Sequence, residues 1–220
     1  MLVQQRCFTL GHSTHTNDYL AGLLKLHGIE LLIDIRSVPY SRYNPQYNRE
    51  NIKVFSGQNG IAYVFMGASL GARYQNRELY FSDRETADFK KVRETAVFKR
   101  GIEKVVNGIR KGQKICLLCS EKDPFDCHRF VLVSYALVKK GIDVRHILEK
   151  GELISNDILE ERLLQKYKIE YGRLTLFGRP VSKEEAIDEA YERRNRDIGR
   201  EKIETAINAP REALDAKVLT

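Results

Sequence analysis

The stretch KICLLCSEKDPFDCHRFVLVSYAL, residues 114–137, decides the fold class, because a polar loop joins a strand pattern to a helix pattern. Residues 114–119 form a nearly continuous apolar run, which is typical of a strand covered on both faces. A second apolar stretch runs from Cys127 to Gly141, and we predict a helix there. The loop between them crowds thiols, carboxylates, an imidazole and a guanidinium into one short connection.

The same alternation of patterns runs through the first 150 residues. Strands are predicted at 7–10, 30–36, 61–66, 114–119 and 143–148. A helix capped by Thr16 or Asn17 is predicted to end at Gly28, and another spans 88–112 with a break near Gly101. Strands separated by helices indicate right-handed crossovers and a mainly parallel sheet. We therefore expect a three-layer α/β fold with helices on both faces of the sheet.

The charge balance changes near residue 150. Residues 1–150 hold 24 Lys and Arg against 15 Asp and Glu, whereas residues 151–220 hold 13 against 15. Charged residues at helical spacing dominate the second part. We predict an α/β core at 1–150 and a mostly helical extension at 151–220. The extension is expected to pack on the core or to contact another subunit in a homo-oligomer.

The composition favours a cytoplasmic protein. Its four cysteines are too sparse in 220 residues for a disulfide scaffold, so a reducing compartment fits them better. No window approaches the roughly 18 apolar residues of a membrane span, and the first residues do not resemble a leader. We expect no membrane partner.

The predicted topology points to a site at one edge of the sheet. Ligands of open parallel sheets bind beyond the carboxyl ends of the strands. In this sequence those ends are GHST (11–14), RSVPYSRYNPQYNRE (36–50), GASLGARYQNR (67–77) and SEKDPFDCHR (120–129). These loops are rich in arginine, and the positive field of the first 150 residues favours anionic ligands. The expected partner is a phosphate-bearing small molecule or nucleic acid.

The chemistry-bearing residues of these loops fall into two groups. Acid–base or nucleophilic chemistry is predicted for His12, Asp34, Glu121, Cys127 and His128. Anion binding is predicted for Ser13, Arg36, Ser41, Arg42 and Arg129. Aromatic residues that could stack on a base are Tyr40, Tyr43, Tyr47 and Phe125.

The turn that contains Cys127 is expected to open a helix. Asp126 is the predicted N-cap, which would place Cys127 at a helix N-terminus, where a thiol becomes more acidic. Arg129 in the same turn could fix an anion. In the alternative interpretation, Cys127 is a small buried apolar residue and Arg129 pairs with Asp34 or Glu121.

Other thiol chemistries fit the sequence less well. A phosphatase of the Cys-x5-Arg type is excluded, because Phe125 and Val133 stand six residues after Cys119 and Cys127. A redox pair of Cys116 and Cys119 would lie inside a buried strand. A metal site of Cys119, Cys127 and His128, helped by His12 or Glu121, has suitable ligands but an unusual spacing. A positive helix terminus would also oppose a cation.

Four motifs together resemble one known family. They are Gly11-His12-Ser13, Asp34-Ile35-Arg36, Pro39-Tyr40-Ser41-Arg42 and the run from Cys119 to Arg129. In this pattern the sequence resembles the family called domain of unknown function, number 488, over roughly residues 6–150. One departure is that Ala72 follows Gly71 where the family usually has a second glycine. The resemblance implies an α/β fold and a shared pocket, but no reaction.

These observations favour an enzyme, or an enzyme-like binder, of a phosphate-bearing ligand such as a nucleotide or a nucleic-acid end. A non-enzymatic nucleic-acid-binding module is the alternative, and a Cys/His metal or thiol-redox site also stays open. The sequence identifies no particular cofactor.

Overall fold

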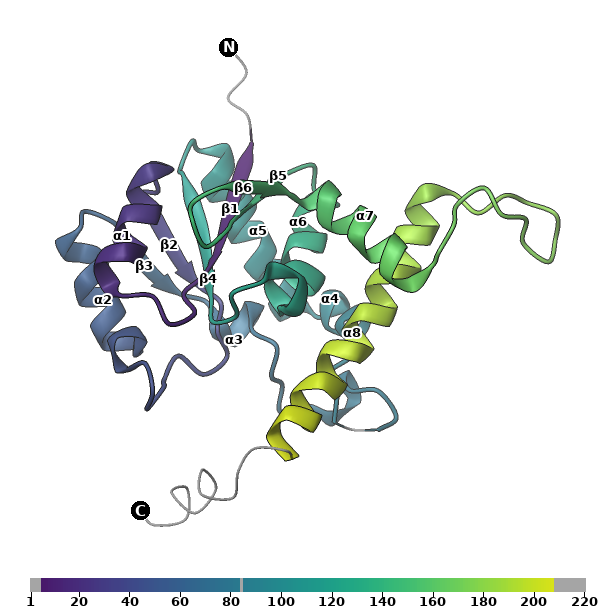
Figure 1. The fold of residues 1–220 in the computed structure, drawn as a ribbon, viewed down its shortest axis with the longest axis horizontal. Coiled ribbons are helices and arrows are strands. Elements are labelled where there is room, and N and C mark those ends of the chain that lie inside the picture. The colour runs from purple at the N-terminus through teal and green to yellow at the C-terminus, as the bar shows by residue number, and fades with distance from the viewer. Residues whose placement is uncertain (1–4, 84, 208–220) are drawn as a thin grey trace.

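A six-stranded sheet forms the centre of the computed structural model, which describes residues 5–83 and 85–207 (Figure 1). The strands are β1 (Arg6–Gly11), β2 (Leu31–Asp34), β3 (Ala62–Phe65), β4 (Ile115–Cys119), β5 (Asp143–Ile147) and β6 (Leu153–Ser155). Their order is β3-β2-β4-β1-β5-β6, with only β6 antiparallel to its neighbour. The predicted α/β fold with a mainly parallel sheet is confirmed.

Helices cover both faces of this sheet. The helices are α1 (Asn17–Leu26), α2 (Arg49–Gln58), α3 (Gly67–Leu70), α4 (Phe89–Glu94), α5 (Ala96–Arg110), α6 (Tyr135–Val138), α7 (Asn156–Tyr167) and α8 (Lys183–Ile207). Short 3-10 turns lie at Pro45–Tyr47, Arg77–Leu79 and Pro124–Asp126, and a π-helical turn spans Arg129–Ser134. In Figure 1, α1 and α2 lie on one side of the strands, and α5 and α6 lie on the other.

Strand β4 divides its side chains between two cores. Cys116 and Leu118 join the core under α1 and α2. Leu117 and Cys119 join the larger core on the opposite face, which also contains Cys127. The alternation follows from the two-residue period of a strand. It places Cys119 and Cys127 on the same face and Cys116 on the other.

Two local predictions are wrong. The helix over 88–112 breaks at Thr95, whose hydroxyl accepts a hydrogen bond from the Phe98 N–H and caps α5. Gly101 lies inside α5 at a close contact, since a Cβ there would come within 2.9 Å of Leu70. The loop predicted over 36–50 is also too long at its end, because α2 begins at Arg49, and no element was predicted over 51–57.

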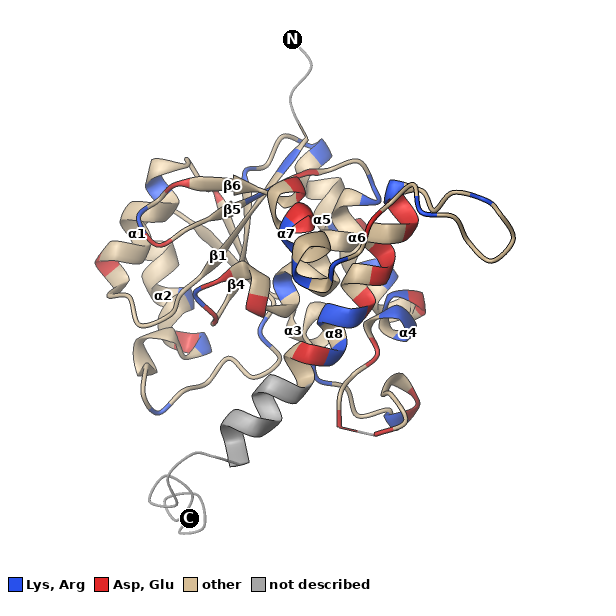
Figure 2. Ribbon diagram, turned by 45° about the vertical axis from the view of Figure 1, so that its right-hand side comes forward, with Lys and Arg blue, Asp and Glu red and all other residues tan. Residues whose placement is uncertain are grey.

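The described part of the C-terminal extension, residues 151–207, is mostly helical, as predicted, but it also contributes β6 to the sheet. Figure 2 shows acidic and basic residues interleaved along α8. Some of them bind the rest of the protein, for example through Lys90–Glu192 (2.8 Å) and Lys139–Asp188 (3.2 Å). The sheet therefore extends past residue 150, where the composition changes, and includes one strand of the extension. No helix in the described ranges is long and apolar enough to cross a membrane.

Candidate functional site

Four side chains of the loop after β4 meet at the carboxyl edge of the sheet. The Cys119 and Cys127 sulfurs lie 3.1 Å apart, and each lies within 3.1 Å of Glu121 Oε2. His128 Nδ1 lies 3.5 Å from Cys119 Sγ and 3.9 Å from Cys127 Sγ. We call these four residues, Cys119, Glu121, Cys127 and His128, the Cys–His cluster. Glu121 is half-buried and the other three are buried.

The loop owes its shape to a capped 3-10 turn. Asp123 accepts a hydrogen bond from the Phe125 N–H (2.8 Å), and Pro124 begins the 3-10 turn. The Cys127 N–H then donates to the Pro124 carbonyl. Asp126 is therefore not an N-cap, and that prediction is wrong. Its carboxylate instead accepts a hydrogen bond from Arg194 of α8 (2.6 Å).

Arg129 holds this loop from inside the fold. Its side chain is fully buried, and its guanidinium donates to the backbone carbonyls of Glu121 and Lys122. Gly11 makes room for this arrangement, because a Cβ at that position would lie 1.7 Å from the Glu121 carbonyl oxygen. The predicted anion contact through Arg129 thus gives way to contacts with the protein backbone.

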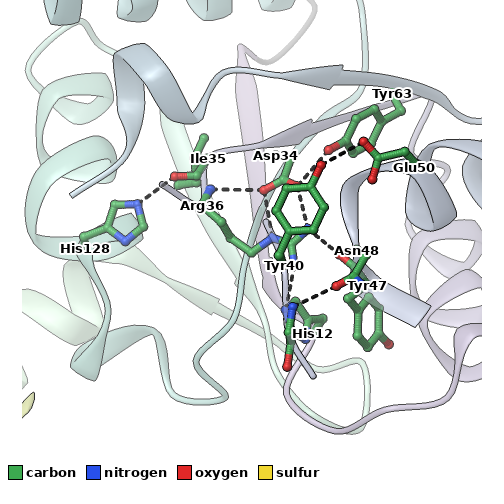
Figure 3. A network of polar contacts seen from close by, with 11 residues as sticks. His12, Asp34, Ile35, Arg36, Tyr40, Tyr47, Asn48, Glu50, Tyr63 and His128 are labelled. Atoms are coloured by element: carbon green, nitrogen blue, oxygen red, sulfur yellow. Dashed lines mark hydrogen bonds and ion pairs between the residues drawn. The ribbon is translucent and has the colours of Figure 1, made fainter. Parts of the chain in front are cut away.

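A second network joins the ends of β1 and β2 (Figure 3). Both oxygens of the buried Asp34 carboxylate accept hydrogen bonds from Arg36, whose Nη2 lies 2.6 Å from Asp34 Oδ2. Tyr63 donates to the same carboxylate (2.8 Å), and Arg36 also donates to the Tyr47 carbonyl. Asp34, predicted as a catalytic group, is therefore the buried counter-ion of Arg36.

His12 belongs to this second network. Its Nδ1–H donates to the Ser13 carbonyl, so its Nε2 accepts a hydrogen bond from Arg36 (3.1 Å). Burial and the neighbouring Arg36 lower the pKa of His12 to about 4, and its ring stacks on Tyr47 at 4.0 Å. His12 thus orients Arg36 as a neutral imidazole.

The two networks meet at a small cleft. The cleft has a volume of ≈ 120 Å³. Its lining comprises Arg36, Ser37, Val38, Ala72, Arg73, Cys119, Ser120, Glu121 and His128. His128 Nε2 lies 3.1 Å from the Ile35 carbonyl, which ties the cluster to the end of β2. The loop after β1 reaches the same edge, where the His12 N–H donates to the Cys119 carbonyl, but His12 does not line the cleft.

Besides Arg129, three predicted anion-binding residues do not line this cleft. Ser13 has φ of +47° and donates its N–H to the Ser120 carbonyl. Ser41 accepts a hydrogen bond from the Asn44 N–H and shapes the next loop. Arg42 is exposed in that loop. Of the predicted anion-binding residues, Arg36 alone is part of the cleft wall.

Sequence analysis missed Ser37, and it placed Arg73 in the loop 67–77 at this edge without assigning it a role. The Ser37 hydroxyl accepts hydrogen bonds from the Ala72 and Arg73 N–H groups (2.8 and 3.0 Å) and holds the third loop against the second. Gly71 has φ of −72°, and Ala72 is not among the residues with positive φ. The sequence did carry a signal for both residues, because Ser37 follows strand β2 and Arg73 follows strand β3 at the same edge of the sheet.

The two thiols of the cluster differ in acidity. Burial raises the pKa of Cys119, and its contact with Cys127 adds to the effect. Burial also opposes ionisation of Cys127, but the hydrogen bond with Cys119 and the positive charge of Arg129 outweigh it and lower the pKa of Cys127 to about 6. Of the two thiols, Cys127 therefore loses its proton first, and Cys119 keeps its proton.

The fold and the site define an α/β protein with a Cys/Glu/His cluster at the carboxyl edge of a parallel sheet. The sequence model of the family described as "Domain of unknown function DUF488" matches residues 16–136. This match covers more than half of the chain, and the protein belongs to that family. No curated protein matches the sequence, and no solved structure matches the fold.

Proposed function

We propose that this protein is an enzyme that acts on a small anionic group, such as the phosphate of a phosphate-bearing ligand. One observation supports the proposal above the others. The cleft of ≈ 120 Å³ is lined by Cys119, Glu121 and His128 together with two arginines, Arg36 and Arg73. Groups that move protons or attack an electrophile thus share one cleft with groups that attract negative charge.

The two arginines contribute differently. Arg36 commits Nε, both N–H groups of Nη2 and one of Nη1 to Asp34, Tyr47 and His12. A guanidinium has five N–H donors, so a single donor of Arg36 is left for a ligand. Arg73 is exposed, and its guanidinium makes no hydrogen bond or ion pair with any residue that the structure describes. Arg73 is therefore the principal anion-binding side chain.

The size of the cleft limits what enters it. Pockets that enclose a whole small-molecule ligand measure roughly 300–1,000 Å³, so this cleft accepts the anionic group and leaves the remainder outside. Tyr40 and Tyr43, 55% and 85% exposed, lie on the loop that follows the same strand as Arg36. An aromatic base of the ligand could stack on one of them.

The test is a thermal-shift titration of the full chain with inorganic phosphate and a nucleoside monophosphate at low ionic strength. Native-state binding raises the melting temperature, by an amount equivalent to about 2.7 kcal/mol at a hundredfold excess over Kd. Arg73→Ala should remove most of the shift. Arg110→Ala is the matched control, because Arg110 is exposed at the end of α5 that leads into the opposite edge of the sheet.

Two results would contradict this proposal. One is the absence of any shift with either compound at millimolar concentration. The other is an equal shift for Arg73→Ala and Arg110→Ala, which would mean that the cleft is not where the anion binds.

Nucleic acid is the second candidate ligand, and the exposure of Tyr43 beside Arg42 favours it. Stacking of a base on an exposed tyrosine contributes about 1–3 kcal/mol. A fluorescence-anisotropy titration with a short single-stranded oligonucleotide should show binding that weakens with salt and is reduced by Tyr43→Ala. Salt-independent binding, or none, would dismiss this candidate.

A further inference from the structure

We propose that the Cys–His cluster, Cys119, Glu121, Cys127 and His128, binds one divalent transition-metal ion, for which zinc is the best match. The inference goes beyond the proposed function. It depends on the ligand atoms of the cluster and not on whether an anion enters the cleft.

The spacing of the ligand atoms suits a tetrahedral ion. The four atoms all lie within 4.8 Å of one another, and the five hydrogen-bond contacts between them span 3.0 to 3.9 Å. Bonds of about 2.0–2.3 Å to a tetrahedral zinc place neighbouring ligand atoms roughly 3.3–3.8 Å apart. The shorter contacts are already close to this range, and closing the widest pair by about 1 Å would seat the ion.

The orientation of His128 is the strongest indication. A carbonyl oxygen only accepts hydrogen bonds, so the contact of His128 Nε2 with the Ile35 carbonyl (3.1 Å) fixes the hydrogen on Nε2 (Figure 3). Nδ1 then presents its lone pair to the two sulfurs. Metal-binding histidines almost always donate their other ring N–H to a carbonyl or carboxylate in this way.

The charges also balance around an ion. Two thiolates, one carboxylate and a divalent cation sum to a single negative charge. The guanidinium of Arg129 is fully buried behind the same loop. The backbone nitrogen of Arg129 also lies 3.4 Å from Cys127 Sγ, to which it donates a hydrogen bond. One buried positive charge thus offsets the one negative charge of the loaded site.

The chemistry of the ligands points to zinc. Two sulfurs, one imidazole nitrogen and one carboxylate oxygen form a mixed soft and borderline set, whereas magnesium and calcium prefer oxygen alone. A helix does begin beside the cluster, because the π-helical stretch from Arg129 continues directly into α6. The three negative charges of the ligands outweigh the partial positive charge of about +0.5 at its N-terminus. Cys119 and Cys127 are buried, and the half-buried Glu121 occupies the position that faces the cleft.

The alternative for this pair of thiols is redox chemistry. The free sulfurs of Cys119 and Cys127 lie 3.1 Å apart, a distance that fits a reduced thiol pair as well as two ligands of one ion, so the other two side chains decide. The carboxylate of Glu121 lies within 3.1 Å of both sulfurs. Beside two thiolates, the carboxylate of Glu121 is a third negatively charged group, which would bind a cation but has no part in a disulfide bond. Metal binding therefore accounts for all four side chains.

The experiment measures zinc on the full chain. Protein purified under reducing conditions is stripped with a chelator, and Zn²⁺ is titrated against a competing chromophoric chelator. We expect binding of one ion per chain, and binding of Co²⁺ with the intense thiolate-to-metal absorption of a tetrahedral sulfur site. Cys127→Ser should weaken zinc binding by more than the roughly 100-fold that loss of an outer hydrogen-bond partner causes.

Cys116→Ala is the matched control, because Cys116 is equally buried on the opposite face of β4. It should bind zinc as the wild type does. Glu121→Gln keeps the shape of a half-buried side chain and removes its charge, so it should fold normally and bind zinc more weakly. The proposal is overturned by wild-type protein that holds no zinc, by thiolate-free Co²⁺ spectra, or by Cys127→Ser and Glu121→Gln that bind as tightly as wild type. Loss of phosphate binding with zinc binding intact would refute the proposed function alone.

Discussion

Arg194→Ala should destabilise the protein through the loop that carries the Cys–His cluster. Arg194 lies on α8 and is 1% exposed. Its Nε donates to the Phe125 carbonyl (3.1 Å), and its Nη2 to Asp126 Oδ1 (2.6 Å). Both partners belong to the loop between Glu121 and Cys127. Helix α8 thus fixes this loop from outside the cleft.

The magnitude follows from the exposure of the two partners. Asp126 is 53% exposed, so its ion pair contributes at most about 1 kcal/mol. The buried hydrogen bond from a charged donor to the Phe125 carbonyl contributes about 1.5–3 kcal/mol. We therefore expect Arg194→Ala to lower the free energy of unfolding by about 3 kcal/mol.

Equilibrium unfolding in urea measures this difference, and the adjacent Arg193→Ala is the control. Arg193 is 49% exposed and pairs with Glu189 on the surface of the same helix, so its loss should cost less than about 1 kcal/mol. The loosened loop should also let a thiol reagent modify Cys127 faster. Equal destabilisation by the two variants would contradict the anchoring role of Arg194.

Three further predictions concern the strands beneath the site. Gly11→Ala should fail to fold stably, because its Cβ would meet the Glu121 carbonyl at 1.7 Å; wild-type circular dichroism and melting temperature would refute this. Burial lowers the pKa of His146 to about 3. As the pH falls below about 6.5, the unfolded chain therefore binds a proton that the native state does not. The free energy of unfolding should decrease by about 1.4 kcal/mol for each pH unit from there down to about pH 3. Unfolding measured from pH 7 to 4 should show a shallower fall for His146→Gln, and identical slopes would count against it. Tyr63→Phe removes the hydrogen bond to Asp34 and should cost about 1 kcal/mol in urea unfolding; an unchanged midpoint would speak against that contribution.

The sequence was sufficient for the alternation of strands and helices. Apolar runs such as 114–119 had strand length, and Thr16 caps α1 as predicted. Helix α2 was missed because its buried residues are only Ile52 and Ser56, too few for a clear helical period. Strand β6 was missed because three residues at the edge of a sheet carry no pattern.

The composition of the site was predictable, but the partners of its residues were not. Topology alone brings the loops after β1, β2 and β4 to one edge, and this placed Cys119, Glu121 and His128 correctly beside Arg36. Whether a guanidinium faces the cleft or the interior depends on which carbonyls lie within its reach. Arg129 turned inward for that reason.

One error had a signal that could have prevented it. Asp123 followed by Pro124 is a typical start of a helical turn, since proline is favoured at the first position. The helix that follows begins at Arg129 and continues through α6, so its N-terminus lies next to His128 and not at Asp126.

X-ray absorption at the zinc K edge of the zinc-loaded protein tests the central claim most directly. The account predicts two sulfur neighbours at about 2.3 Å and two nitrogen or oxygen neighbours at about 2.0–2.2 Å, with one sulfur lost in Cys127→Ser. A shell of nitrogen and oxygen alone, unchanged in Cys127→Ser, would show that zinc binds elsewhere and would contradict the account.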